Sequence, residues 1–222
     1  MNLIDTFFNT EVLQAIWPLL AQGLWLTVKL SLVIVPLAAV LGLLIACAYY
    51  QGNRMLNRII LLYVDFFRAF PPLVLLIFIY YGLPFLGAQF DEFTATVVAL
   101  VLNGSSYFAE IFRAGLESVS PGQNEAARST GLNSVQAMTH VIVPQGVRNV
   151  IPDLASNTLE AIKQTSIASA VALPELLRVA QIAQGQTYSQ TPLIAAAIIY
   201  LVVLWPLVRM ISRMQKPAVI PH

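Results

Sequence analysis

Five long apolar segments dominate the 222-residue sequence and restrict the folds open to it. A transmembrane helix needs about 20 mostly apolar residues. Windows that meet this requirement lie at about 20–49, 59–84, 93–114, 149–173 and 192–212. Lipid offers no partners for backbone N–H and C=O groups, so segments of this length must satisfy them as helices. The sequence therefore predicts an all-α integral membrane protein with five transmembrane helices in one domain, residues 1–222.

The composition agrees with this class and excludes others. Only 10% of the residues are charged, against about 25% in soluble proteins. The formal net charge of +1 gives no basic excess for nucleic acid. A single cysteine, Cys47, permits neither an intrachain disulfide nor a cysteine-rich metal site. His140 and His222 have no neighbours at metal-ligand spacing. We therefore expect no metal or cofactor on this chain, and membrane lipid around it.

Two local features stand near the first two apolar windows. Residues 3–17 place apolar side chains at helical spacing, which predicts a helix lying in the membrane interface. They contain no Lys or Arg, so we expect mature sequence rather than a cleaved signal peptide. In the second window Asp65 and Arg68 are three residues apart and are expected to pair. Pro71-Pro72 removes two backbone donors, so the second helix should kink or break there.

The distribution of Lys and Arg predicts the orientation, because cytoplasmic loops are enriched in them. If the N-terminus lies outside, eight of the 12 fall on the cytoplasmic side: Arg54, Arg58, Arg113, Arg128, Arg148, Arg209, Arg213 and Lys216. The outer loops then receive only Arg178. We expect an N-out/C-in protein, in which about 115–148 forms the longest cytoplasmic loop.

This cytoplasmic loop is predicted to form two short helices. Ser120 suits an N-cap, Pro121 the first helical position, and Gln123 stands three residues after the cap. Gly131 can end the helix in a left-handed conformation. A helix over 121–130 is too short to persist alone in water. A second amphipathic stretch follows and is expected to stop at Pro144. The pair could fit a groove of another protein or serve only as a connector.

The spacing in this loop resembles a known motif. Glu125-Ala126-Ala127, three residues, Gly131, nine residues and then residues 141–144, Val-Ile-Val-Pro, is similar to the EAA motif of ABC importer permeases. That motif ends in Ile-x-Leu-Pro, from which the valines at 141 and 143 depart. Segments 68–84, 107–127 and 163–181 resemble the polar amino-acid branch of the same family. The resemblance covers roughly residues 20–215.

The resemblance implies a type I ABC importer permease-like fold in the bacterial inner membrane. It also implies the transmembrane subunit of an ATP-driven importer that moves a polar amino acid or analogue by alternating access. The implied partners are a cytoplasmic ABC ATPase dimer, a second permease subunit in a homo- or heterodimer, and an extracytoplasmic substrate-binding protein. In that family the loop forms coupling helices seated in a cleft of the ATPase. The residues assigned to this contact are Glu125, Ala126, Ala127, Arg128, Gly131 and Pro144.

The sequence contains no GxxxxGK[ST] phosphate-binding loop. We therefore expect this chain not to be an enzyme, and ATP and Mg to bind on the partner ATPase. Nor does it contain a GxSxG elbow, so a membrane hydrolase is disfavoured. The alternative function left open is a small oligomeric channel or secondary carrier that ATP does not drive.

Polar side chains near the middle of the third and fourth apolar windows form a second candidate site. Ionisable residues at membrane depth are costly and indicate function. A zwitterionic substrate needs partners of both signs there. The candidate substrate pathway consists of Asn103, Ser105, Ser106, Glu110, Glu160, Lys163, Gln164 and Thr165. Alternatively, the hydroxyl and amide groups join helices, while Glu160 and Lys163 neutralise each other.

Overall fold

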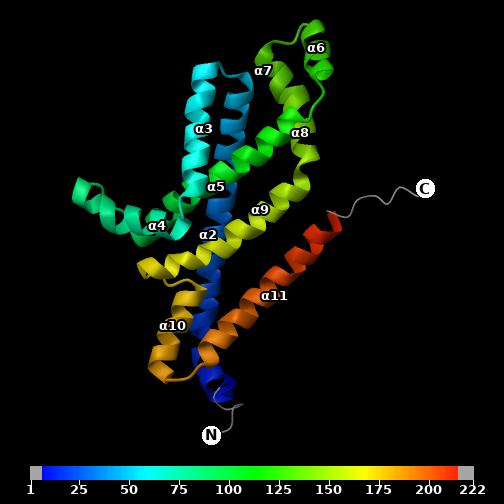
Figure 1. Ribbon diagram of the computed structural model, residues 1–222. Coiled ribbons are helices and arrows are strands. Elements are labelled where there is room, and N and C mark those ends of the chain that lie inside the picture. The colour runs from blue at the N-terminus through cyan, green and yellow to red at the C-terminus, as the bar shows by residue number, and fades with distance from the viewer. Residues whose placement is uncertain (1–6, 215–222) are drawn as a thin grey trace. The chain divides into compact units, whose positions relative to one another are not determined.

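The computed structural model describes residues 7–214, which are mostly helical and contain no strand (Figure 1). The elements in chain order are α2 (Thr10–Gln51), α3 (Arg54–Ala69), α4 (Pro72–Ile77), the π-helix η1 (Phe78–Gly82), the 3-10 helix η2 (Leu83–Leu86), α5 (Glu92–Glu117), α6 (Pro121–Ser129), α7 (Ser134–Ala137), the π-helix η3 (Met138–Ile142), α8 (Val143–Asn149), α9 (Ile151–Gln164), the 3-10 helix η4 (Thr165–Val171), α10 (Leu176–Thr187) and α11 (Thr191–Met214).

Three of these helices, α2, α5 and α11, are long and apolar enough to cross a membrane. The number rises to as many as five if each of two bent pairs is one span: α3 with α4–η2, and α9–η4 with α10. The all-helical prediction is confirmed. The count of five spans and the N-out/C-in orientation stay predictions.

The first helix is longer than expected. Asn9 Oδ1 accepts hydrogen bonds from the backbone N–H groups of Glu11 and Val12, and the helix then continues from Thr10 to Gln51 without a break. From Thr10 onward, therefore, the expectation of a separate interfacial helix is wrong. The reason is packing, because Ile16 and Leu20 are buried in a core with residues of α10 and α11. Residues 3–6 of that expected helix lie outside the described residues.

The second apolar segment breaks where the two prolines predict it. Phe70 ends α3 with an extended backbone, φ −82° and ψ 123°. This conformation follows from Pro71, because a residue before proline is disfavoured in the helical region. Pro72 is then the first residue of α4, a position where a missing N–H does no harm.

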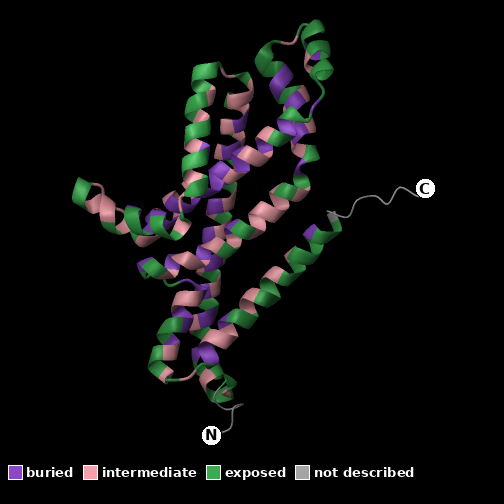
Figure 2. Ribbon diagram, in the orientation of Figure 1, coloured by how far each residue is buried: buried purple, intermediate pink, exposed green. Residues whose placement is uncertain are grey.

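The chain forms two compact units. Among the described residues the first contains 7–34, 72–100 and 159–214, and its core includes Leu20, Leu176 and Val179. The second contains 35–71 and 101–158. Its core residues include Phe108, Phe112, Leu116, Met138 and Ile142. Figure 2 shows the buried residues, in purple, along α5. The second core therefore packs α5 against the segment that holds the EAA-like spacing.

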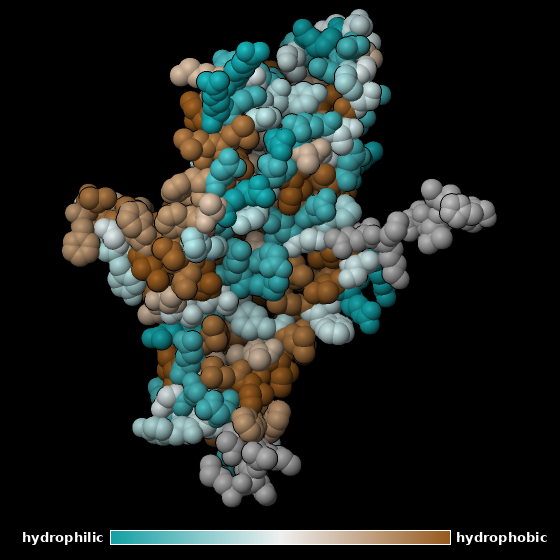
Figure 3. All heavy atoms as spheres, viewed as in Figure 1, coloured by the Kyte–Doolittle hydropathy of each residue, from teal (hydrophilic) through white to brown (hydrophobic). Residues whose placement is uncertain are grey.

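Large apolar side chains are widely exposed. Trp25 and Leu32 of α2 are each 67% exposed, and Val202 of α11 is 65% exposed. Figure 3 shows hydrophobic side chains, in brown, on the face that it presents. Soluble monomers rarely expose large contiguous apolar surfaces. These helices are therefore suited to contact with lipid or with other apolar protein surfaces.

Candidate functional site

The helix α6 begins at the predicted residue and ends at Ser129, one residue before the predicted end, but its first turn is closed differently. Pro121 occupies the first turn, as expected. In the described structure, however, the Ser120 side chain makes no capping hydrogen bond, and the Gln123 N–H instead donates to the Ser120 carbonyl at 2.9 Å. At the other end Gly131 has φ +91°. Its N–H donates to the Arg128 carbonyl, and the Leu132 N–H donates to the Ala127 carbonyl. This is a Schellman motif, which confirms the left-handed role of Gly131.

The second arm of the loop starts with a cap that the sequence interpretation missed. The Asn133 side chain accepts from the Gln136 N–H, and the Gln136 side chain accepts from the Asn133 N–H. This reciprocal capping box begins α7. Its sequence signal, Asn-x-x-Gln before Ala137-Met138, was available.

Pro144 does not stop the second helix, so that prediction is wrong. After α7 the backbone widens into the π-helix η3, and Pro144 lies in the first turn of α8. A proline is tolerated in a first turn. The wider turn leaves helix carbonyls for side chains to satisfy. Thr139 Oγ1 donates to the Val135 carbonyl at 2.9 Å, and His140 Nδ1 lies 3.0 Å from the Gln136 carbonyl.

The residues assigned to the ATPase contact divide by exposure. Glu125, Ala126 and Arg128 are exposed, and we call them the α6 face. Ala127 is buried within the loop, and its carbonyl accepts from Thr130 Oγ1 at 2.9 Å. The Arg128 guanidinium donates to the Leu132 carbonyl at 2.7 Å and so supports the glycine turn. Gly131 and Pro144 are exposed as well, so every residue of the assigned set except Ala127 can be approached by another protein.

Two glycines hold the loop against α5. Gly115 and Gly146 are buried, and their backbones meet so closely that a Cβ on Gly115 would lie 2.5 Å from the Gly146 carbonyl oxygen. Asn149 Nδ2 also donates to Ser118 Oγ at 2.8 Å. The two ends of the loop are thus joined. This contact supports a helix as short as α6, and the sequence interpretation missed it.

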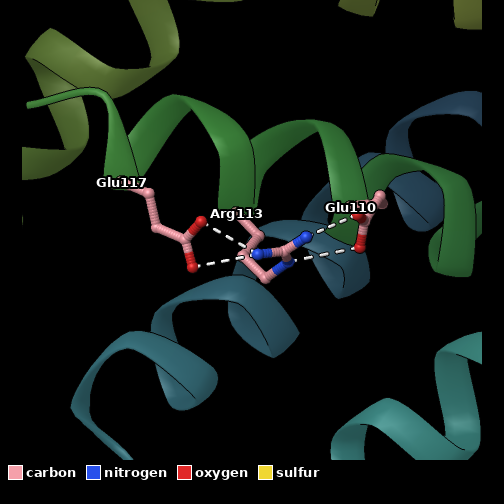
Figure 4. Close-up of polar contacts among 3 residues, drawn as sticks. All are labelled: Glu110, Arg113 and Glu117. Carbon is pink, nitrogen blue, oxygen red and sulfur yellow. Dashed lines mark hydrogen bonds and ion pairs between the residues drawn. The ribbon is translucent and has the colours of Figure 1, made fainter.

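Glu110, assigned to the substrate pathway, lies instead in an ion-pair cluster on α5 (Figure 4). Arg113 Nη2 is 2.5 Å from Glu110 Oε1, and Arg113 Nη1 is 2.9 Å from Glu117 Oε2. The guanidinium also lies over the Tyr49 ring of α2, 5.6 Å from its centroid. Partly exposed pairs of this kind contribute about 0.2–1 kcal/mol each. Their geometry ties the end of α5 to α2.

The other polar residues of α5 make helix-to-helix or local hydrogen bonds. Asn103 Nδ2 donates to the Phe67 carbonyl at 2.6 Å, and Asn103 is fully buried. Ser105 Oγ is 2.7 Å from the Tyr63 hydroxyl. Ser106 Oγ donates to the Asn103 carbonyl. The structure thus brings these three residues against α3 or against their own helix.

The expected pair of Asp65 and Arg68 is absent from the described ion pairs. Both side chains are exposed. Arg68 instead lies over the ring of Tyr107, 5.5 Å from its centroid. The attraction between a cation and an aromatic face accounts for this choice.

Glu160 and Lys163 form an ion pair on α9. Lys163 also lines an open groove of about 400 Å³ in the first unit, together with Ser166 and Tyr200. Gln164 ends α9 and is half-buried. Thr165 is buried and donates to the Ile162 carbonyl at 2.7 Å. Among the described residues, those that line the groove thus include Lys163 of the predicted pathway but none of the pathway residues on α5.

Two functional candidates near this groove escaped the sequence interpretation. Glu175 is fully buried and caps α10 by accepting from the N–H groups of Leu177 and Arg178. It also accepts from the Tyr200 hydroxyl at 2.9 Å. An acidic residue directly before an apolar stretch was a signal for Glu175. Tyr200 stands in an apolar window with no pattern to single it out.

Comparison with known proteins agrees with this architecture. The probable amino-acid ABC transporter permease protein YckA of Bacillus subtilis (strain 168) is 36% identical over 197 residues, covering 88% of this chain and 87% of that protein. The arginine transport system permease protein ArtQ of the same organism is 34% identical over 187 residues, covering 83% of this chain and 85% of ArtQ.

The chain is also similar to solved structures and matches a family model. The crystal structure of an amino acid ABC transporter with histidines has a TM-score of 0.81 and 37% identity, covering 91% of this chain and 95% of that one. The MetNI methionine ABC transporter, in an inward-facing conformation, shares the fold with a TM-score of 0.76 and 20% identity, covering 90% and 96%. Residues 38–217 match the family described as binding-protein-dependent transport system inner membrane component. The chain belongs to this family of ABC transporter permease subunits and is a multi-pass protein of the inner membrane.

Proposed function

We propose that this chain is the transmembrane subunit of an ATP-driven importer for a polar amino acid or a close analogue. The observation that carries the proposal is the α6 face, presented by a loop that Gly115 and Gly146 fix against α5. The names of the relatives, which include amino-acid permeases, support the substrate class. We propose five spans, with the N-terminus outside and the α6 face in the cytoplasm.

The partners follow from this placement. A cytoplasmic ABC ATPase dimer receives the α6 face and holds ATP and Mg, so this chain needs no nucleotide site of its own. Glu125 supplies charge and Ala126 allows close approach of the backbone. A second permease subunit completes the pathway, and an extracytoplasmic protein delivers the substrate, as the family description suggests.

The groove beside Lys163 is the proposed place for the amino acid. Lys163 offers an ammonium group for a carboxylate, and Glu160 offers a carboxylate for an ammonium group. The two side chains are 46% and 58% exposed, and they neutralise each other when no substrate is present. A zwitterion could exchange for both partners without leaving a charge unpaired. The Tyr200 hydroxyl and Ser166 add polar contacts.

Transport then proceeds by alternating access. Closure of the ATPases moves the loop that contains α6, and the helices reorient around the substrate site. Direction comes from the different substrate affinities of the outward and inward states.

Reconstitution into liposomes tests the proposal. The chain is combined with its ATPase and binding protein, and uptake of labelled amino acids is measured with and without ATP. Uptake that requires ATP hydrolysis and the ATPase is expected. Uptake that persists without either would support a channel or secondary carrier instead.

Charge reversal tests the α6 face. Glu125→Lys should abolish ATPase association and uptake while the protein still inserts. Gln123→Lys adds a positive charge two residues away, outside the α6 face, and serves as the control. Equal association of both variants with the ATPase would remove Glu125 from the contact.

A further inference from the structure

The break after α3 leaves specific backbone carbonyls without helical donors. In a continuous helix the N–H of each residue donates to the carbonyl four residues earlier. Pro71 and Pro72 have no N–H. The prolines therefore remove the donors of the Phe67 and Arg68 carbonyls, and the end of α3 leaves those of Ala69 and Phe70 without helical donors as well.

The helix α5 supplies a substitute donor for the Phe67 carbonyl and another for the Arg68 carbonyl. Asn103 Nδ2 donates to the Phe67 carbonyl at 2.6 Å, with a second, longer contact of 3.4 Å to the Phe70 carbonyl. One turn further along α5, the Tyr107 hydroxyl donates to the Arg68 carbonyl at 3.3 Å. We call this arrangement the carbonyl clasp, made by Asn103 and Tyr107.

The environment of Asn103 shows that its donors are what the clasp uses. The residue is fully buried, and the carbonyls in front of it fix the amide nitrogen toward α3. Its Oδ1 finds no hydrogen-bond partner among residues 7–214. A buried acceptor is normally satisfied. The side chain of Asn103 is thus oriented so that its N–H groups donate to α3 while its Oδ1 stays without a donor in the described structure.

The break is also a distinctive point along the chain. The chain passes between the two compact units at 34/35, 71/72, 100/101 and 158/159. Three of these passages lie inside the helices α2, α5 and α9. Of these four passages only the one at 71/72 lies outside a helix, so the chain can bend there without breaking one.

We infer that Asn103 and Tyr107 are positioning residues of the transport cycle. The clasp keeps the end of α3 on α5 while the segment beyond Pro72 bends. At its other end α5 leads into the loop that carries α6 and contacts that loop through Gly115. Movement of the loop therefore passes along α5 to the bend. This role rests on the proposed function as a transport subunit.

Double-mutant cycles in the reconstituted complex test the clasp. Asn103→Ala and Tyr107→Phe should each lower uptake per ATP hydrolysed, by about fivefold or more for the buried Asn103, with ATPase association unchanged. Asn103→Gln retains the amide donor and should recover part of the loss. Pro71→Ala restores an N–H for the Phe67 carbonyl. In that background Asn103→Ala should have little further effect, whereas Tyr107→Phe should act as it does in the wild-type chain.

Three results would overturn the inference. The first is an Asn103→Ala loss of the same size in the wild-type chain and in the Pro71→Ala background. The second is a loss of folded protein, measured by thermal unfolding of the purified complex, with uptake per folded complex unchanged. The third is a Tyr107→Phe effect that vanishes together with the Asn103 effect in the Pro71→Ala background. If the wild-type complex itself showed no ATP-dependent uptake, the proposed function would fail, and the thermal unfolding cycle would still measure the clasp.

Discussion

The contact between Gly115 and Gly146 allows a quantitative prediction for Gly115→Ala. The new Cβ would lie 2.5 Å from the Gly146 carbonyl oxygen and 3.0 Å from each methyl carbon of Val150. An ordinary carbon–oxygen contact is about 3.3 Å, so α5 and α8 must separate by about 0.8 Å. Overpacking of this kind costs about 1–3 kcal/mol, which is about 5- to 140-fold in the folding equilibrium. For a chain of this length it lowers the Tm by about 2–4 °C per kcal/mol.

The assay combines thermal unfolding of the detergent-purified chain with capture of the partner ATPase. We expect Gly115→Ala to lower both the Tm and ATPase capture, because the displaced contact positions the loop that carries α6. Gly146→Ala meets the Gly115 oxygen at 2.9 Å and should act in the same direction. The double variant should fall short of the sum, since both changes disrupt one contact.

Gly122→Ala is the matched control in the same loop. A Cβ there meets only Ser120 Oγ, at 3.8 Å, among the described residues. A helical position with free space gains up to about 1 kcal/mol when Gly becomes Ala. The reasoning is refuted if Gly115→Ala keeps the wild-type Tm and ATPase capture, or if Gly122→Ala is equally harmful.

Further substitutions test the glycine turn, the buried acid and the cap of α5. Gly131→Ala should lower the Tm, because a side chain at φ +91° costs about 1–2 kcal/mol of folding free energy. Gly131→Asn should lower the Tm less, since Asn tolerates that backbone region. Glu175→Gln should lower the free energy of unfolding by about 1–3 kcal/mol, because the new amide N–H groups would face the donors that the carboxylate now satisfies. Tyr200→Phe removes only one of these donors and should cost less. Equal Tm values for the two variants would contradict this interpretation. Asp91 precedes α5 and caps it, because its Oδ2 accepts from the N–H groups of Phe93 and Thr94. Hydrogen bonds from the Thr94 side chain and backbone hold the pKa of Asp91 below its usual value. A lowered folded-state pKa stabilises above the unfolded-state pKa, about 3.9, and this stability is lost as the pH falls through the folded-state pKa. The Tm of the wild-type chain should therefore fall more than that of Asp91→Asn on acidification below about pH 4. Parallel pH profiles of the two Tm values would contradict the lowered pKa of Asp91.

Features fixed by neighbouring residues could be predicted from the sequence. The break at Pro71 follows from a missing N–H, and the left-handed Gly131 follows from a missing Cβ. Features that depend on distant partners could not. The Gly115–Gly146 contact joins residues 31 positions apart. Pro144 looked like a helix stop because nothing local announces the π-helix η3 that accommodates it.

The carbonyl clasp changes how polar residues at membrane depth are interpreted in this chain. Such residues suggest substrate binding because their burial is costly. A helix broken by proline also needs buried hydrogen-bond donors, however, because no water is available at membrane depth to hydrogen-bond its free carbonyls. Pro71 and Pro72 create two such carbonyls, and α5 supplies two donors for them. Asn103 is therefore explained by backbone chemistry before any substrate is invoked. The charges that we propose for a zwitterion are Glu160 and Lys163, which pair with each other and are bound to no backbone group by their charged ends in the described structure; Lys163 also lines the groove.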